Sequence, residues 1–248
     1  MSSEGVEKEV VGGNEFYDKA KEYWSNIQPT VDGVLGGFGH ISQSDITGSE
    51  QFLRDVFKLD RPPGRGRALD CGAGIGRVTK HLLANFFAKV DLVDQNKDFV
   101  NKATEYVGEI PQIGNLYVAG LQEFQPTEKY DVIWCQWVLG HLTDDHLVEF
   151  FMKCQNCLAE RGMIVIKENH TSSGEVDVDE ETGFPRVQRG LVGARTPLYS
   201  KDIWRCPCSP VQEKTSSFLH SILRTSGSFL ENVRFGVFER RDISQPLR

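Results

Sequence analysis

The chain has 248 residues, of which 39% are hydrophobic and 25% charged, a composition typical of one or two globular domains. Its net charge of −7 argues against a nucleic-acid-binding surface, which is normally basic. The same charge suits a small cationic ligand or a basic peptide, although a solvated acidic surface would explain it equally well. The N-terminus has no apolar run of signal-peptide length, and no stretch approaches the roughly 18 apolar residues of a membrane span, so we expect no membrane segment.

The six cysteines indicate a reducing compartment and predict a location in the cytoplasm and nucleus. Cys154 and Cys157 have the CxxC spacing of metal and redox sites, but Cys154 also continues a helical stripe of apolar residues, which favours packing in the core. Cys206 and Cys208 lack a second ligand pair at zinc spacing. We therefore expect no metal site.

Two helices and a glycine-containing loop are predicted at the N-terminus. Apolar residues recur every three to four positions over residues 15–27 and again over 48–59, which indicates amphipathic helices. Between them, residues 30–42 contain four glycines and predict a loop that bends sharply. The segment 61–66 is rich in proline and glycine and is typical of a linker.

Strand-like and helical patterns then alternate along the chain. The predicted strands are 68–71, 89–94, 115–119, 130–136 and 163–167, and the predicted helices are 77–87, 97–107 and 143–158, the last of them ended by Gly162. This alternation predicts an α/β fold with a mostly parallel sheet, right-handed crossovers and helices on both faces. Residues 183–214 show no periodicity, and a helix over 216–223 and a strand over 233–238 are expected after them.

The stretch ALDCGAGIGRVTKHLL, residues 68–83, places three glycines between a strand-like run and a helical one. In a doubly wound sheet the first strand-to-helix turn carries the ligand, because glycines let the backbone approach and the helix N-terminus offers N–H groups. Asp94 lies 22 residues after Gly72, at the end of the next predicted strand, where a carboxylate accepts ribose hydroxyls. Glycines that merely close a tight turn are the alternative interpretation.

The spacing of these glycines distinguishes between nucleotide ligands. The dinucleotide fingerprint G-x-G-x-x-G requires a third glycine where Arg77 stands, which disfavours a nicotinamide oxidoreductase. Gly72, Gly74 and Gly76 instead have a G-x-G-x-G spacing that resembles the first motif of class I S-adenosylmethionine-dependent methyltransferases. That cofactor has no pyrophosphate, and its carboxylate suits a nearby arginine such as Arg77.

Several further stretches resemble the protein alpha-N-terminal methyltransferases, which methylate the α-amino group of proteins beginning X-Pro-Lys once the initiator methionine is removed. The resemblance rests on AKEYWSNIQPTVDGVLGGFGHIS, ALDCGAGIGR, VDLVDQNKDF, AGLQEF, YDVIWCQWVLGHLTDDHL and GMIVIKEN, which cover about residues 14–170 in order. It implies a Rossmann-like class I methyltransferase fold in one domain. Residues 1–60 would form an N-terminal helical cap over the substrate site, 61–170 the cofactor-binding core and 171–248 a substrate-side and divergent segment.

The resemblance also implies a set of site residues and partners. The implied S-adenosylmethionine contacts are Gly72, Arg77, Asp94, Gln95, Asn96, Leu121, Gln122 and Gln136. The residues implied to face the peptide are Tyr23, Trp24, Gly36, Trp137 and Asn169. His141, together with a nearby aspartate, is implied to handle the proton, and the implied partners are proteins with exposed X-Pro-Lys N-termini.

Methylation of an α-amine explains why residues of these types would be needed. An α-amine has a pKa of about 7.7–8.0 and cannot attack a methyl group while it is protonated, so a base must remove a proton directly or through water. His141 titrates in the required range, although a histidine satisfied at a helix start is the structural alternative. Trp24 and Trp137 could flank a cationic amine or lysine, although core packing is an equally good interpretation of each residue alone.

The resemblance ends in the C-terminal third of the chain. An acidic stretch at 175–181 corresponds to the family's substrate-amine site, and Asp177 and Asp179 are both candidates for the base, with a solvated acidic loop as the alternative. Beyond residue 183, the family's closing helix and antiparallel strand pair have no recognisable counterpart in the sequence. A methyltransferase for another amine or small molecule, or a non-catalytic variant that binds cofactor or peptide, therefore remains an alternative.

Overall fold

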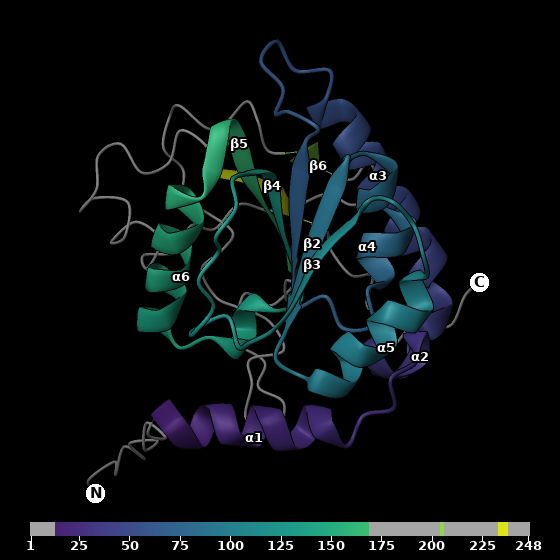
Figure 1. Ribbon diagram of the computed structural model, residues 1–248, viewed down its shortest axis with the longest axis vertical. Helices are drawn as coiled ribbons and strands as arrows, with labels where there is room; N and C mark the ends of the chain where they lie inside the picture. Colours follow the sequence, from purple (N-terminus) through teal and green to yellow (C-terminus); the bar gives the residue numbers. More distant parts are fainter. Residues whose placement is uncertain (1–12, 169–203, 206–232, 238–248) are drawn as a thin grey trace, which may run out of the picture.

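A sheet of parallel strands forms the centre of the computed structural model, which describes residues 13–168, 204–205 and 233–237 (Figure 1). The strands are β1 (Arg67–Cys71), β2 (Lys89–Asp94), β3 (Ile113–Val118), β4 (Tyr130–Gln136), β5 (Leu158–Lys167), β6 (Trp204–Arg205) and β7 (Val233–Val237). Their order is β3-β2-β1-β4-β5-β7-β6. The order reverses between β1 and β4, and such a switch point is where open α/β sheets bind ligands. The predicted Rossmann-like α/β fold is confirmed.

Helices cover both faces of this sheet (Figure 1). One side carries α3 (Ser42–Val56), α4 (Arg77–His81) and α5 (Lys97–Val107), the other side carries α6 (Asp144–Asn156), and α1 (Gly13–Ser25) crosses one end. Short turns complete the described part: α2 (Val31–Val34), η1 (Gly39–Ile41), η2 (Leu83–Asn85) and η3 (Leu139–His141). No helix among the described residues is long and apolar enough to cross a membrane.

Strand β4 shows how the sheet separates two apolar cores. Val132 and Trp134 point into the core beneath α3, whereas Ile133 and Cys135 point into the core beneath α6. Both sets are fully buried, which is why the strand is a continuous apolar run without polar alternation. Cys154 of α6 is buried in the second of these cores, so its predicted packing role is confirmed.

Helix α3 belongs mainly to the face of the sheet, although its residues were expected to lie in a cap. Its buried residues are Ile46, Ser49, Phe52, Leu53 and Val56. The helix begins at Ser42, before the residue 48 that the apolar periodicity predicts. The polar residue Ser49 interrupts that periodicity on the buried face, where its Oγ donates to the Asp45 carbonyl one turn earlier at 2.9 Å.

Three predicted boundaries need correction. Residues 30–42 are not an irregular loop throughout, since they contain α2 and η1. The predicted helix 77–87 stops at His81, because Leu82 leaves helical conformation at φ −122° and ψ −71°. Gly162 does not end α6, which stops at Asn156; it lies within β5, where a Cβ would come within 2.4 Å of the Tyr130 carbonyl oxygen.

The sheet continues past β5 with strands from the C-terminal segment. Strand β7 pairs with β5 and β6 pairs with β7, both in parallel. The predicted strand 233–238 is therefore confirmed, and the edge of β5 is covered. The family's antiparallel closing pair had no recognisable counterpart in the sequence, and the strands observed at this edge of the sheet are a parallel pair instead. The predicted helix over 216–223 lies outside the described residues.

Candidate functional site

A cavity opens where the loops that follow β1, β2 and β4 meet the end of α1. It encloses about 930 Å³ of space, its open mouth included. The lining residues are Trp24, Val34, Leu35, Asp70, Gly72, Ala73, Gly74, Arg77, Val78, Asp94, Gln95, Phe99, Ala119, Gly120, Leu121, Gln122, Gln136, Trp137, Val138, His141 and Leu142. Most of this wall is apolar, with a few carboxylates and amides, which is typical of a site for a small organic ligand.

The glycine loop after β1 forms one wall of the cavity. Gly74 has a φ of +56°, and its N–H donates to Asp94 Oδ2 at 2.8 Å. A Cβ on Gly74 would lie 3.2 Å from Val34, so a side chain there would press against α2. Gly76 also has a positive φ, of +79°, and a Cβ there would meet Val107 of α5 at 2.6 Å. The loop therefore needs glycine both for its turn and for close packing on both sides.

Two carboxylates stand beside this loop, Asp70 fully buried and Asp94 partly buried. Asp94 ends β2 and also accepts the backbone N–H of Asn96 at 2.8 Å. Burial raises its pKa, while the N–H groups of Asn96 and Gly74 partly lower it. Asp70 in β1 accepts the Thr79 hydroxyl at 2.6 Å, and burial raises its pKa to about 6. Asp70 was not among the expected site residues, and the only sequence signal for it is an acidic residue within an apolar strand.

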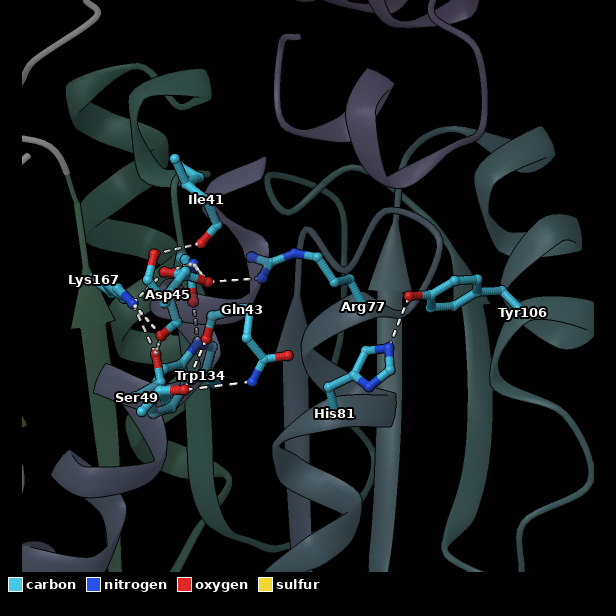
Figure 2. Close-up of polar contacts among 12 residues, drawn as sticks. Ile41, Gln43, Asp45, Ser49, Arg77, His81, Tyr106, Trp134 and Lys167 are labelled. Carbon is cyan, nitrogen blue, oxygen red and sulfur yellow. Dashed lines mark hydrogen bonds and ion pairs between the residues drawn. The ribbon is translucent and has the colours of Figure 1, made fainter. Parts of the chain in front are cut away.

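A group of charged side chains gathers around Asp45 (Figure 2). Asp45 in the first turn of α3 accepts Arg77 Nη1 at 2.7 Å and Gln136 Nε2 at 3.0 and 3.1 Å. Lys167 at the end of β5 donates to the same carboxylate and, at 2.7 Å, to Ser49 Oγ. The side chains of Asp45 and Arg77 are each 5% exposed and that of Lys167 2%. Asp45 was missed because nothing in its local sequence distinguishes it from a surface residue of an amphipathic helix.

Aromatic side chains surround the end of the cavity near α1. The rings of Trp24 and His141 meet edge to face with centroids 5.8 Å apart, and Trp24 also meets Phe99 at 6.1 Å. Trp137 follows β4 with a φ of +54°, and the Arg77 guanidinium lies 5.8 Å from its ring centroid. Burial lowers the pKa of His141 to about 4, so the imidazole is neutral at physiological pH. The Trp24 ring, which lines the cavity beside His141, can therefore hold a cation.

Glu168 fixes the turn that carries His141. Its carboxylate accepts the backbone N–H groups of Val138 at 3.0 Å and Leu139 at 2.9 Å. Burial raises the pKa of Glu168 to about 7, and these two N–H bonds partly lower it. The turn η3 is thus attached to the end of β5, and no apolar or charge pattern in the sequence predicts this bond.

The cavity brings together most of the expected site residues. All of the expected cofactor contacts line it except Asn96, whose side chain caps α5 and donates to the Trp24 carbonyl at 2.8 Å. Of the expected catalytic and peptide-facing residues, Trp24, Trp137 and His141 line it, whereas Tyr23 and Gly36 do not. Asn169, Asp177 and Asp179 lie outside the described residues.

Comparison with known proteins identifies the class of this site. The sequence model of a family described as AdoMet dependent proline di-methyltransferase matches residues 12–190. The chain belongs to this family. It is therefore an S-adenosylmethionine-dependent methyltransferase, and S-adenosylmethionine is its cofactor.

Relatives agree with this assignment along most of the chain. The chain is 50% identical over 209 residues to the human N-terminal Xaa-Pro-Lys N-methyltransferase 1, covering 82% of this chain and 92% of that protein. It is also 50% identical over 190 residues to the Xenopus laevis N-terminal Xaa-Pro-Lys N-methyltransferase 1-A, covering 75% and 83%. A solved S-adenosylmethionine-dependent methyltransferase from Leishmania major superposes with a TM-score of 0.63 at 39% identity, covering 69% of this chain and 68% of that one.

The methyltransferase cavity has the donors and acceptors that this cofactor needs. A nucleoside requires an acceptor for its ribose and an apolar slot for its base, and Asp94 stands beside Leu121, Phe99 and Ala119 in the wall. An amino-acid carboxylate requires a guanidinium or free N–H groups, and Arg77 stands beside the glycine loop. The residues present therefore fit S-adenosylmethionine.

Proposed function

We propose that this methyltransferase acts on the α-amino group of proteins that begin Xaa-Pro-Lys after the initiator methionine is removed. The observation that carries the proposal is the ring contact between Trp24 and His141 in the cofactor cavity, which Trp137 also lines. Aromatic faces attract cationic amines, and a neutral imidazole beside them can accept a proton or hydrogen bond. The names of the human and Xenopus relatives support the same substrate class.

The assignment of the cofactor contacts is part of the proposal. Asp94 would accept the ribose hydroxyls, and Leu121 with Gln122 would flank the base. Arg77, the Gly72 backbone and Gln136 would hold the amino-acid end. When bound, S-adenosylmethionine supplies the methyl group of its sulfonium. Positioning the amine in line with that group would provide most of the rate enhancement.

Proton removal in this mechanism cannot rest on His141 alone. A free α-amine has a pKa of about 7.7–8.0. The pKa of His141 is lowered to about 4 by burial. Moving a proton from the ammonium to this imidazole would therefore cost about 5 kcal/mol, at 1.36 kcal/mol for each pKa unit. We propose that His141 orients the amine as a neutral acceptor, while Asp177 or Asp179, which were expected to be bases, removes the proton.

The partners follow from this proposal. They are proteins with an accessible Xaa-Pro-Lys N-terminus, and the acidic chain would attract the basic third residue. We further propose that the protein works in the cytoplasm and nucleus, without binding nucleic acid or membrane directly.

Mass spectrometry of peptides tests the substrate. A peptide starting Ser-Pro-Lys is incubated with the chain and S-adenosylmethionine beside its N-acetylated form. We expect a gain of whole methyl units on the free peptide and none on the acetylated one, since an amide nitrogen is not nucleophilic.

The other outcomes point to different functions. Methylation of both peptides would locate the reaction on the lysine side chain and would contradict the proposal. No methylation of either peptide, while calorimetry shows binding of S-adenosylhomocysteine, would support the non-catalytic alternative or another amine substrate.

A further inference from the structure

The buried charge cluster around Asp45 connects elements from four parts of the chain. Asp45 comes from α3, Arg77 starts α4, Gln136 ends β4 and Lys167 ends β5. The other three side chains donate to the Asp45 carboxylate, and Figure 2 shows Arg77 and Lys167 meeting it from two sides. Arg77 and Gln136 also line the cavity, whereas Asp45 and Lys167 do not. The carboxylate therefore holds, from outside the cavity, two groups that face its interior.

These contacts fix the orientation of the two cavity-facing groups. The Gln136 amide is held at both ends, because its Nε2 donates to Asp45 and its Oε1 accepts Trp134 Nε1 at 3.1 Å. The Arg77 guanidinium meets Asp45 through Nη1 at 2.7 Å, and its planar fork carries further donors on other edges. The carboxylate of a bound cofactor could therefore contact another edge of the Arg77 guanidinium, whose orientation the Asp45 contact has already fixed.

The cluster depends on the charge of Asp45. Burial raises the pKa of Asp45, but Lys167 and Arg77 outweigh burial and lower it overall, so the group is ionised. A buried cation is costly unless an opposite charge is close. Without the carboxylate, Arg77 and Lys167 would face each other around Trp137, whose ring centroid lies 5.8 Å from one and 5.7 Å from the other. Their repulsion would displace the Arg77 side chain from its present orientation.

We propose that Asp45 is a positioning residue for the amino-acid end of the cofactor: it orients Arg77 and Gln136 so that they bind the carboxylate and amino group of S-adenosylmethionine. The first turn of α3 thereby takes part in cofactor recognition without contacting the cofactor. The proposal rests on the cofactor contacts proposed for Arg77 and Gln136, and it does not depend on which substrate is methylated.

Calorimetry with two nucleosides tests this role in the variant Asp45→Asn, which keeps the shape of the side chain and removes its charge. S-adenosylhomocysteine carries the amino-acid end, and 5′-methylthioadenosine has the same nucleoside without it. We expect the affinity for S-adenosylhomocysteine to fall about tenfold or more and that for 5′-methylthioadenosine to change less than about twofold. Asp55→Asn is the matched control, because it removes the same charge from the same helix at the surface pair with Lys58.

Each remaining result has a defined meaning. An equal loss for both nucleosides would show a merely structural role and overturn the proposal. Unchanged or tighter binding of S-adenosylhomocysteine would overturn it too, because Asp45 would then be neutral or a competitor for Arg77. If Asp45→Asn does not fold, Asp45→Glu restores the charge at a shifted position, and it should bind S-adenosylhomocysteine more weakly than wild type while 5′-methylthioadenosine binding stays unchanged. No peptide is used, so failure of the proposed substrate would not affect the result.

Discussion

At the scale of the residue, the environment of His141 determines both its protonation state and the pH dependence of folding stability. The His141 imidazole lines the cavity and meets the Trp24 ring with centroids 5.8 Å apart, and its Nδ1 atom is buried. Burial lowers the pKa of His141 to about 4 and keeps the imidazole neutral, which is the form able to accept a hydrogen bond from the substrate amine. The free energy of unfolding therefore falls at acidic pH, because the histidine binds a proton more readily in the unfolded chain than in the folded one.

The stability of the protein should reflect this histidine. A folded-state pKa of about 4 lies below the unfolded value of about 6.5, so folding free energy is lost as the pH falls through that window. Relative to His141→Gln, wild type should lose about 2 kcal/mol of unfolding free energy between pH 7.5 and pH 5. Urea unfolding at several pH values measures the difference.

His40, whose side chain is exposed, provides the control for this experiment. His40→Gln should leave the pH dependence of wild type unchanged. A constant difference between wild type and His141→Gln over the whole range would contradict the assigned burial of His141.

At the scale of elements, Asn96 joins helix α1 to helix α5 of the core. Its Oδ1 accepts the backbone N–H of Asp98 at 2.9 Å and so caps α5, while its Nδ2 donates to the Trp24 carbonyl at the end of α1. A second contact joins the other end of α1, where the Tyr17 hydroxyl meets His146 Nδ1 of α6 at 2.7 Å. The position of Trp24 in the cavity thus depends on a helix cap in a distant part of the chain.

The variant Asn96→Asp separates the two roles of this side chain. An aspartate caps a helix as well as an asparagine does, but it presents an acceptor to the Trp24 carbonyl in place of a donor. Amide hydrogen exchange should therefore become about tenfold faster in α1 and stay unchanged in α5, with the peptide KM raised.

The variant Asn96→Ala serves as the comparison for Asn96→Asp, because it removes both contacts and should speed exchange in both helices. Unchanged exchange of α1 in Asn96→Asp would show that the Trp24 contact contributes nothing to docking.

At the scale of the whole molecule, the cofactor cavity lies between the sheet and the N-terminal segment that precedes β1 in the chain. The glycine loop, β2 and β4 supply one wall, while Trp24, Val34 and Leu35 supply the other. A ligand that contacts both walls binds the folded state only, so it must raise the stability of the whole domain.

A thermal shift measures this linkage. S-adenosylhomocysteine at 100 times its Kd should add about 2.7 kcal/mol to the unfolding free energy. For a chain of this size that corresponds to a rise in Tm of about 5–10 °C. NADH at the same concentration should give no shift, and a shift with NADH but none with S-adenosylhomocysteine would contradict the cofactor assignment.

The sequence by itself determined the features that local patterns encode. Alternating apolar periodicities predicted the parallel sheet, and the spacing of Gly72, Gly74 and Asp94 predicted the nucleoside site, because these residues belong to one strand–helix–strand unit. The resemblance added Trp24, Trp137 and His141, which also line the cavity. All of these signals come from residues that are close in the sequence or that belong to a recognisable motif.

The tertiary structure alone decided which distant groups meet. Asp45 and Lys167 are separated by 122 positions, and each has the appearance of an ordinary charged residue in its own segment. The bond from the Asn96 amide to the Trp24 carbonyl likewise depends on the packing of α1 against the loop after β2. Charge pairing and capping across the fold depend on how the sheet brings its strand ends together, and no local periodicity records that geometry.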